Sequence, residues 1–158
     1  MIELQLNEKG DAMIETKDVL GQALDFWVCT CLGQRPEVIM ARALGPTPYS
    51  SDWSLGGPLI HAQNIAISPQ PPSMRLWVAV WPRPATSSKL ILPNSAQPPA
   101  KVGAMAHHPL VAAMRAFVGG RFGTNLLVPK EYHENYRLET EAFLTWLNGP
   151  APASERLQ

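Results

Sequence analysis

The sequence lacks a long apolar run and has few charged residues. Its apolar stretches fall well short of the roughly 18 consecutive apolar residues that span a membrane. The N-terminus also lacks the basic segment followed by an apolar stretch that directs secretion. We therefore expect a cytoplasmic protein that makes no use of a membrane. Charged residues make up only 16% of the chain. Its 158 residues, of which 46% are hydrophobic, suffice for one domain with a buried core.

Cysteine is scarce, and its positions exclude most cysteine chemistry. Cys29 and Cys31 are the only two, and at this spacing within a predicted helix they point to different sides and cannot easily be bridged. His61 has no acid beside it in the sequence, so a metal site lacks ligands. Neither a Walker loop nor a dinucleotide-binding glycine motif is present. We therefore expect no metal and no cofactor.

Residues in the arrangements needed for covalent or acid–base catalysis are also missing. No serine lies in a Gly-x-Ser-x-Gly turn, and the two cysteines lie inside a predicted helix rather than at its start. Glu139 and Glu141 are two residues apart and diverge on a helix, so they do not form a catalytic carboxylate pair. The sequence therefore favours a binding protein over an enzyme.

Acidic residues are absent from the middle of the chain, although the formal net charge is zero. Residues 1–52 contain eight acids and four bases, residues 53–130 contain seven bases and no acid, and residues 131–158 contain five acids and two bases. A basic middle favours an anionic partner. The alternative is that the acidic ends fold over the middle and neutralise it. The zero net charge argues against nucleic acid as the partner.

Hydrophobic periodicity predicts helices and strands in the same domain. Apolar residues at helical spacing predict a helix over residues 18–32 that ends at Gly33. A second helix begins at Pro109, with Arg115 and Arg121 on its polar side and a glycine pair that weakens its end. Predicted strands occupy Ile2–Leu6, Val38–Leu44, Leu59–Ile67, Arg75–Trp81, Lys89–Leu92 and Asn125–Val128.

The predicted strand Arg75–Trp81 is apolar on both faces, so we expect both faces to be covered. This predicts an α+β fold, in the form of an α/β/α sandwich with a mostly antiparallel central sheet flanked by helices. We expect residues 1–150 to form one domain, with its core at 13–128 and a C-terminal helix at about 139–147. Residues 151–158 are expected to be a flexible tail.

The segment Tyr49–Pro58 concentrates polar and aromatic side chains between two predicted strands. Tyr49 and Trp53 are suited to stacking on a planar base, and Asp52 is suited to accepting hydrogen bonds from ribose hydroxyls. The remaining contacts to sugar or phosphate would come from Ser50, Ser51, Gly56 and Gly57. The alternative is a structural loop in which Asp52 and the serines bond the local backbone and Trp53 covers a sheet edge.

Two histidines precede the second predicted helix, where free N–H groups and the helix dipole favour an anion. His107 and His108 would contact a phosphate there, and Arg115 on the same helix completes the predicted binding site. The alternative is that His108 only caps the helix and His107 is solvated.

Three segments, Ala23–Val28, Tyr49–Ile60 and Pro109–Phe117, resemble the phage NinX-like family in order and spacing. The resemblance extends from about Met13 to Val128. It implies a phage or prophage origin and, through a related group of phage proteins, an α/β/α sandwich. It brings no catalytic residues. The first dozen residues, the proline-rich segment Pro93–Val102, expected to be a surface connector, and the C-terminal helix depart from the family pattern.

These features favour a phage-encoded, non-enzymatic protein that binds a small anionic, nucleotide-like molecule and so sequesters a host defence signal. Proteins of this kind often bind their ligand between subunits, so we expect a homo-oligomer in the host cell cytosol. The alternative is a protein-interaction module that inhibits or retargets a host protein through the acidic ends or the proline-rich connector. Binding of nucleic acid and hydrolysis are weaker interpretations.

Overall fold

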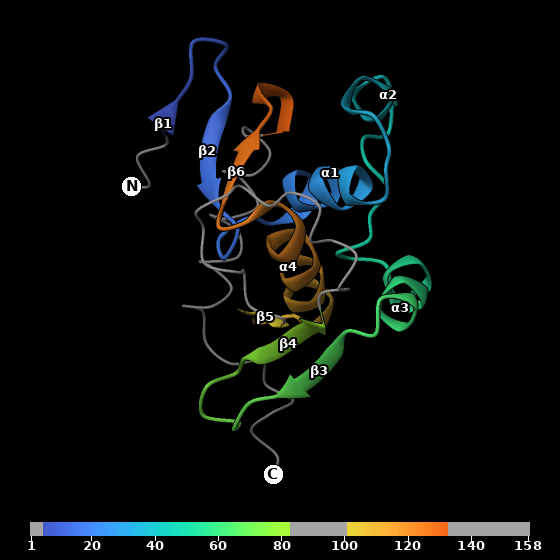
Figure 1. The fold of residues 1–158 in the computed structure, drawn as a ribbon, viewed down its shortest axis with the longest axis vertical. Helices are drawn as coiled ribbons and strands as arrows, with labels where there is room; N and C mark the ends of the chain where they lie inside the picture. The colour runs from blue at the N-terminus through green and yellow to red at the C-terminus, as the bar shows by residue number, and fades with distance from the viewer. Residues whose placement is uncertain (1–4, 83–100, 133–158) are drawn as a thin grey trace, which may run out of the picture.

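The computed structural model describes residues 5–82 and 101–132 (Figure 1). In this part of the chain four helices and six strands form an α+β fold, which confirms the expected class. The strands make two three-stranded antiparallel sheets, ordered β1-β2-β6 and β3-β4-β5. The elements are β1 (Gln5–Leu6), β2 (Ala12–Glu15), α1 (Gly21–Cys31), α2 (Pro36–Met40), α3 (Trp53–Ala62), β3 (Ala66–Pro69), β4 (Trp77–Pro82), β5 (Lys101–Ala106), α4 (Pro109–Phe122) and β6 (Asn125–Val128).

The first sheet joins the two ends of the described chain. In its register Ala12 pairs with Val128 and Ile14 pairs with Leu126, and these four side chains are buried on one face. The residues between them are exposed, as expected of strands with one face on a core. The predicted strand at Asn125–Val128 is confirmed, and β1 lies at the sheet edge as predicted for the N-terminal strand.

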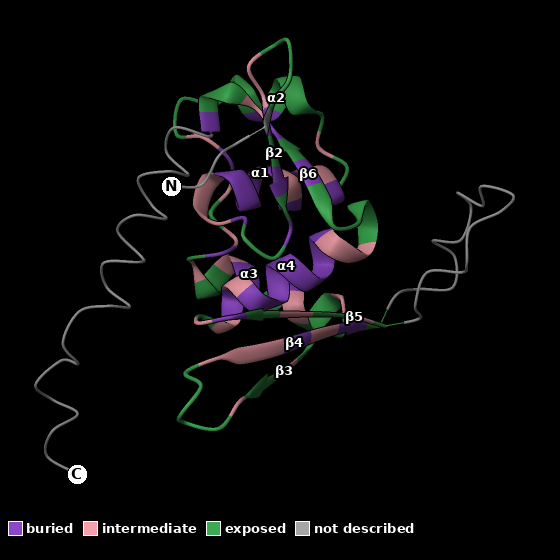
Figure 2. Ribbon diagram, turned by 90° about the vertical axis from the view of Figure 1, so that its left-hand side faces the viewer, coloured by how far each residue is buried: buried purple, intermediate pink, exposed green. Residues whose placement is uncertain are grey.

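The second sheet has β4 at its centre, which confirms a strand within Arg75–Trp81. Its Ala79 and Trp81 are buried on the face that α4 covers (Figure 2). On the opposite face Val78 and Val80 are half-buried. Figure 2 shows α4 between the β3-β4-β5 sheet and α1, and α1 lies at the level of β2 and β6, whereas we expected helices on both sides of one central sheet. The strands divide in this way because β6 follows α4 and pairs with β2 rather than with β4.

Two predicted strands are helical in the structure. Val38–Leu44 contains the end of α2, and Leu59–Ile67 contains the end of α3 followed by the start of β3. Their β-branched residues suggested strands, but local signals specify helices. Pro36 is the first residue of α2, a position that suits its fixed φ, and Asp52 caps the start of α3.

The two longer predicted helices are present with small changes of boundary. The first begins at Gly21, where φ is +52°, and ends before Gly33, where φ is +84°. The second does not end at its glycine pair but continues to Phe122. Strand β5 begins at Lys101, within the predicted connector. The predictions for residues 89–92, for the rest of the connector, for the helix at 139–147 and for the tail lie outside the described residues.

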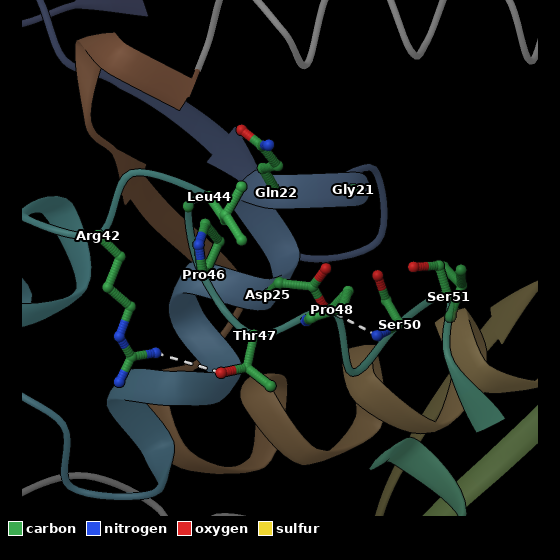
Figure 3. Close-up of a pocket in the computed structure, with 12 residues that line it drawn as sticks. Gly21, Gln22, Asp25, Arg42, Leu44, Pro46, Thr47, Pro48, Ser50 and Ser51 are labelled. Atoms are coloured by element: carbon green, nitrogen blue, oxygen red, sulfur yellow. Dashed lines mark hydrogen bonds between the residues drawn. The ribbon is translucent and has the colours of Figure 1, made fainter. Parts of the chain in front are cut away.

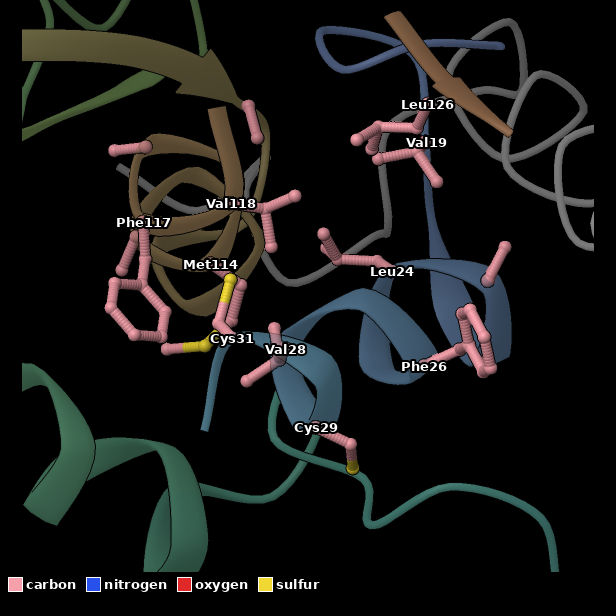
Figure 4. Packing of buried hydrophobic residues seen from close by; sticks show 14 of the residues in the cluster. Val19, Leu24, Phe26, Val28, Cys29, Cys31, Met114, Phe117, Val118 and Leu126 are labelled. Carbon is pink, nitrogen blue, oxygen red and sulfur yellow. The ribbon is translucent and has the colours of Figure 1, made fainter. Parts of the chain in front are cut away.

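The core lies where α1 and α4 meet each other and the two sheets. Figure 4 shows Val28 and Cys31 of α1 beside Met114 of α4, and Leu126 of β6 reaches the same cluster. Each fully buried aliphatic side chain of this kind contributes about 1.5–3 kcal/mol. Both cysteines are free, and burial raises the pKa of the Cys31 thiol to about 12. That thiol is therefore a packing group and not a nucleophile.

Candidate functional site

A cavity of about 780 Å³ opens beside the start of α1 (Figure 3). This volume is typical of small-molecule sites, which measure about 300–1,000 Å³. Its wall combines α1, the segment between α2 and α3, and the first turn of α4. The lining residues are Gly21, Gln22, Asp25, Arg42, Leu44, Gly45, Pro46, Thr47, Pro48, Ser50, Ser51 and Val111.

Hydrogen bonds hold the wall segment Arg42–Ser51 at both ends. At one end, the Ser50 backbone N–H donates to Asp25 Oδ1 at 2.7 Å, which ties the segment to α1. At the other end, Arg42 Nη1 donates to Thr47 Oγ1 at 3.1 Å and Arg42 Nη2 donates to Gln34 Oε1 at 2.8 Å. The cavity therefore has a wall that is fixed before any ligand enters.

The two charged groups of the wall lie at opposite ends of it. Figure 3 shows Asp25, Ser50 and Ser51 together at one end and Arg42 at the other. Asp25 is 3% exposed, whereas Arg42 is exposed. The end at Asp25 accepts hydrogen bonds and the end at Arg42 donates them. Leucine, proline and valine side chains among the lining residues supply an apolar surface.

A second cavity of about 320 Å³ lies against the same segment. Gln22, Arg42, Leu44 and Gly45 line both cavities, so the segment separates them. Glu131 and Tyr132 lie on the far wall of the smaller one. A ligand group can therefore approach Arg42 from either of the two cavities.

The predicted loop residues do not gather around one cavity. Ser50 and Ser51 line the large cavity, whereas Tyr49, Asp52 and Trp53 are not among its lining residues. Asp52 Oδ1 accepts from the Ser54 backbone N–H at 2.8 Å and from Ser54 Oγ at 2.7 Å. These bonds cap α3 and hold the pKa of the Asp52 carboxyl below its usual value.

The predicted glycine pair lies inside α3 and not in a loop. A Cβ on Gly56 would lie 2.5 Å from Tyr49 O and 2.7 Å from Leu110 Cδ2, so a side chain has no room there. The Gly56 N–H donates to Asp52 O at 2.8 Å within the helix. The missing side chain at Gly56 therefore lets α3 pack closely against Tyr49 and Leu110. Gly57 has ordinary space, with the Trp53 ring 3.9 Å from its would-be Cβ.

The predicted histidines lie where the starts of α3 and α4 meet. The rings of Trp53 and His108 have centroids 6.4 Å apart, and Trp53 is 52% exposed. His107 Nδ1 lies 2.8 Å from Arg75 O, next to the second sheet. His108 occupies the N-cap position of α4 but its side chain makes no capping bond, and burial lowers its pKa.

Arg115 does not lie on a polar side of its helix, and that prediction is wrong. It is 8% exposed, and its Nε donates to Val19 O at 2.9 Å and its Nη1 to Met105 O at 3.1 Å. The guanidinium thereby joins α4 to β5 and to the segment before α1. It lines a separate cavity of about 180 Å³. Arg121, by contrast, is exposed as predicted and stacks over Phe117 at 5.4 Å.

Sequence reasoning missed Asp25 and Arg42. Asp25 was visible as an acid within an otherwise apolar helical stretch, which is a signal for a buried carboxylate with a partner. Arg42 gave no signal, because its position depends on how the segment between α2 and α3 folds back. Within 5–82 and 101–132 no three His, Cys, Asp or Glu side chains gather in a way that could hold a metal. Across the same ranges, no helix has the length and apolar character of a membrane span.

Comparison with known proteins identifies the family. The family model described as Bacteriophage P22, NinX matches residues 15–121, which include α1, every residue that lines the large cavity and nearly all of α4. No curated protein matches the chain. Since the matched region covers more than half of the sequence, the chain belongs to the Bacteriophage P22, NinX family.

Proposed function

We propose that this phage protein binds a small anionic, nucleotide-like molecule in the 780 Å³ cavity and acts by sequestering it from the host, without chemical conversion. The observation that carries the proposal is the cavity itself, with a cation and several hydroxyls on one preformed wall. A single nucleotide fits in a cavity of this size.

The chemistry of the wall supports an anionic ligand. A guanidinium presents several N–H donors in a plane that matches a phosphate or carboxylate. Arg42 uses two of its donors on the neutral oxygens of Thr47 and Gln34, and among the described residues it has no ion-pair partner. Its positive charge therefore remains available. Thr47, Ser50 and Ser51 add hydroxyls that donate or accept as the ligand requires.

Isothermal titration against mono-, di- and cyclic nucleotides tests this function. We expect at least one nucleotide to bind the wild type, and Arg42→Ala to weaken it by about tenfold or more, the scale of a lost charge-assisted hydrogen bond. Arg35→Ala is the matched control, because Arg35 is also exposed but is not a lining residue. If the folded wild type gives no heat with any nucleotide, the proposed function is wrong.

A further inference from the structure

We propose that the smaller, 320 Å³ cavity is a second binding site and that it takes a free amino acid with an apolar side chain. The charged residues that line it have opposite signs: Arg42, which follows α2, and Glu131, which follows β6. Arg42 binds the carboxylate of the amino acid, and Glu131 binds its ammonium group. This site is separate from the nucleotide site proposed above, although the two cavities share Arg42.

The Arg42 guanidinium is held in place and still has donors to offer. Nη1 donates to Thr47 Oγ1 at 3.1 Å and Nη2 donates to Gln34 Oε1 at 2.8 Å, and both acceptors are neutral. A guanidinium carries more N–H donors than these two bonds use. Arg42 is exposed, and within 5–82 and 101–132 no carboxylate forms an ion pair with it. A ligand carboxylate can therefore bind it through charge-assisted hydrogen bonds.

The Glu131 carboxylate is the negative group of the same cavity. The neighbouring Tyr132 fixes its segment, because the Tyr132 N–H donates to Pro129 O at 2.9 Å and the buried Tyr132 ring lies against Phe26, with centroids 5.3 Å apart. The Glu131 side chain is exposed, and in the part of the chain that the structure describes it forms neither a hydrogen bond nor an ion pair. It can therefore accept hydrogen bonds from a ligand ammonium group.

The charges of this cavity favour a zwitterion over an ion of one sign. An anion at Arg42 shares the cavity with the like charge of Glu131, and a cation at Glu131 shares it with the like charge of Arg42. A ligand that carries both charges meets an opposite charge at each end. The cavity therefore disfavours a nucleotide, whose phosphates would all be negative, and suits an amino acid.

The size and the apolar lining of the cavity fit an apolar amino acid. Its volume of 320 Å³ lies near the lower end of the range for small-molecule sites. Met40 and Leu44 line it and are 41% and 94% exposed. A ligand side chain such as that of leucine would cover apolar surface that is otherwise in contact with water, which favours binding.

An NMR titration at millimolar ligand tests the site by comparing L-leucine with two analogues that each lack one charge. N-acetyl-L-leucine keeps only the carboxylate, and L-leucinamide keeps only the ammonium group. We expect the wild type to bind leucine about fivefold more tightly than either analogue, the upper scale for one exposed ion pair. The largest changes in backbone amide shifts should fall within residues 40–45 and 131–132.

Two charge variants assign the contacts. Arg42→Ala should weaken the binding of leucine and N-acetyl-leucine but not of leucinamide. Glu131→Gln should weaken the binding of leucine and leucinamide but not of N-acetyl-leucine. Arg35→Ala and Glu37→Gln are the matched controls and should change none of the three affinities, because both residues are exposed and line neither cavity. The amide spectrum of each variant checks its fold.

A third variant separates this site from the proposed nucleotide site. Ala43 lines the smaller cavity and not the larger one, so Ala43→Trp should abolish leucine binding and keep nucleotide binding. Ala41→Trp should keep both, because Ala41 is exposed and lines neither cavity.

Three results would overturn the inference. They are a wild type that does not bind leucine, an analogue that binds as tightly as leucine, and an Ala43→Trp variant that retains leucine binding in full. A wild type that binds leucine but no nucleotide refutes only the proposed function.

Discussion

At the scale of residues, the glycine pair of α4 has one member without room for a side chain and one with room. A Cβ on Gly120 would overlap the ring of the buried Trp81, whereas a Cβ on Gly119 would lie 3.4 Å from Thr16 Cγ2, an ordinary contact. The missing side chain at Gly120 lets α4 approach β4. This explains why the helix continues through two glycines that each lower helix stability.

We expect Gly120→Ala to destabilise the protein by about 1–3 kcal/mol, because the methyl group must displace Trp81 or shift the helix. Gly119→Ala is the matched control, and it should leave stability unchanged or raise it by up to about 1 kcal/mol through helix propensity. Denaturant titration followed by circular dichroism measures both. Equal effects of the two substitutions would show that the packing of α4 on β4 differs from this description.

The residues of the large cavity show how far sequence reasoning reaches at this scale. Ser50 and Ser51 were found because they lie in a segment rich in polar and aromatic residues. Asp25 was missed and Arg115 was placed wrongly on a polar side, because whether a charged residue on a helix is buried depends on what packs against it. Arg115 bonds two carbonyl oxygens that lie 96 and 10 residues away in the sequence, and periodicity contains no information about such partners.

At the scale of elements, α3 and α4 differ in how their first turns are capped. Asp52 bonds the Ser54 N–H at the start of α3, whereas His108 makes no side-chain capping bond at the start of α4. Both residues have the extended backbone typical of an N-cap. The first turn of α3 therefore has a side-chain capping bond, whereas the first turn of α4 lacks one.

We expect His108→Ser to stabilise the protein by about 0.5–1 kcal/mol at pH 7, because serine would accept a bond from a free N–H of the first turn. The gain should increase as the pH falls below 6.5, the ordinary pKa of histidine. Since the folded pKa of His108 is lowered, the wild type loses stability when the imidazole is protonated at acid pH. Thermal unfolding at pH 7 and pH 5 measures the difference. A smaller gain at pH 5 would contradict this assignment.

We expect Asp52→Ala to destabilise the protein, because the substitution removes the side-chain cap of α3. Since the folded pKa of Asp52 is lowered by its bonds from Ser54, its stabilising contribution is present above its ordinary value of 3.8 and is lost as the pH falls below it. The difference in unfolding temperature between wild type and variant should therefore be largest near neutral pH. A difference that stays constant down to pH 3 would show that the charge of Asp52 has no part in capping.

Most elements could be predicted from local patterns, and the errors share one cause. Helices α1 and α4 and strand β4 have clear periodicity and were found. The short helices α2 and α3 contain β-branched or glycine-rich sequences that favour other structures, and only their first residues, Pro36 and the Asp52 cap, specify helix. In short elements a single terminal residue outweighs the average preference of the segment.

At the scale of the whole molecule, the described chain closes on itself through two sheets, with α4 packed between the second sheet and α1 (Figure 2). This closure creates the large cavity, since its wall comes from segments centred near residues 22, 46 and 111. The sequence alone predicts the α+β class, but it does not show which strands share a sheet. Pairing of β2 with β6 links residues 110 or more positions apart, and no local pattern specifies such a pair.

The central claim is that the cavity beside α1 holds a small molecule, and a native mass spectrum of protein purified from phage-infected cells tests it most directly. We predict that the wild type carries an adduct with the mass of a small molecule. Ser51→Trp, which fills the cavity wall, should lose it, and Ser73→Trp, which places the same side chain on the exposed turn between β3 and β4, should keep it. The claim would be contradicted if none of the three proteins carried an adduct, or if Ser51→Trp retained the adduct in full.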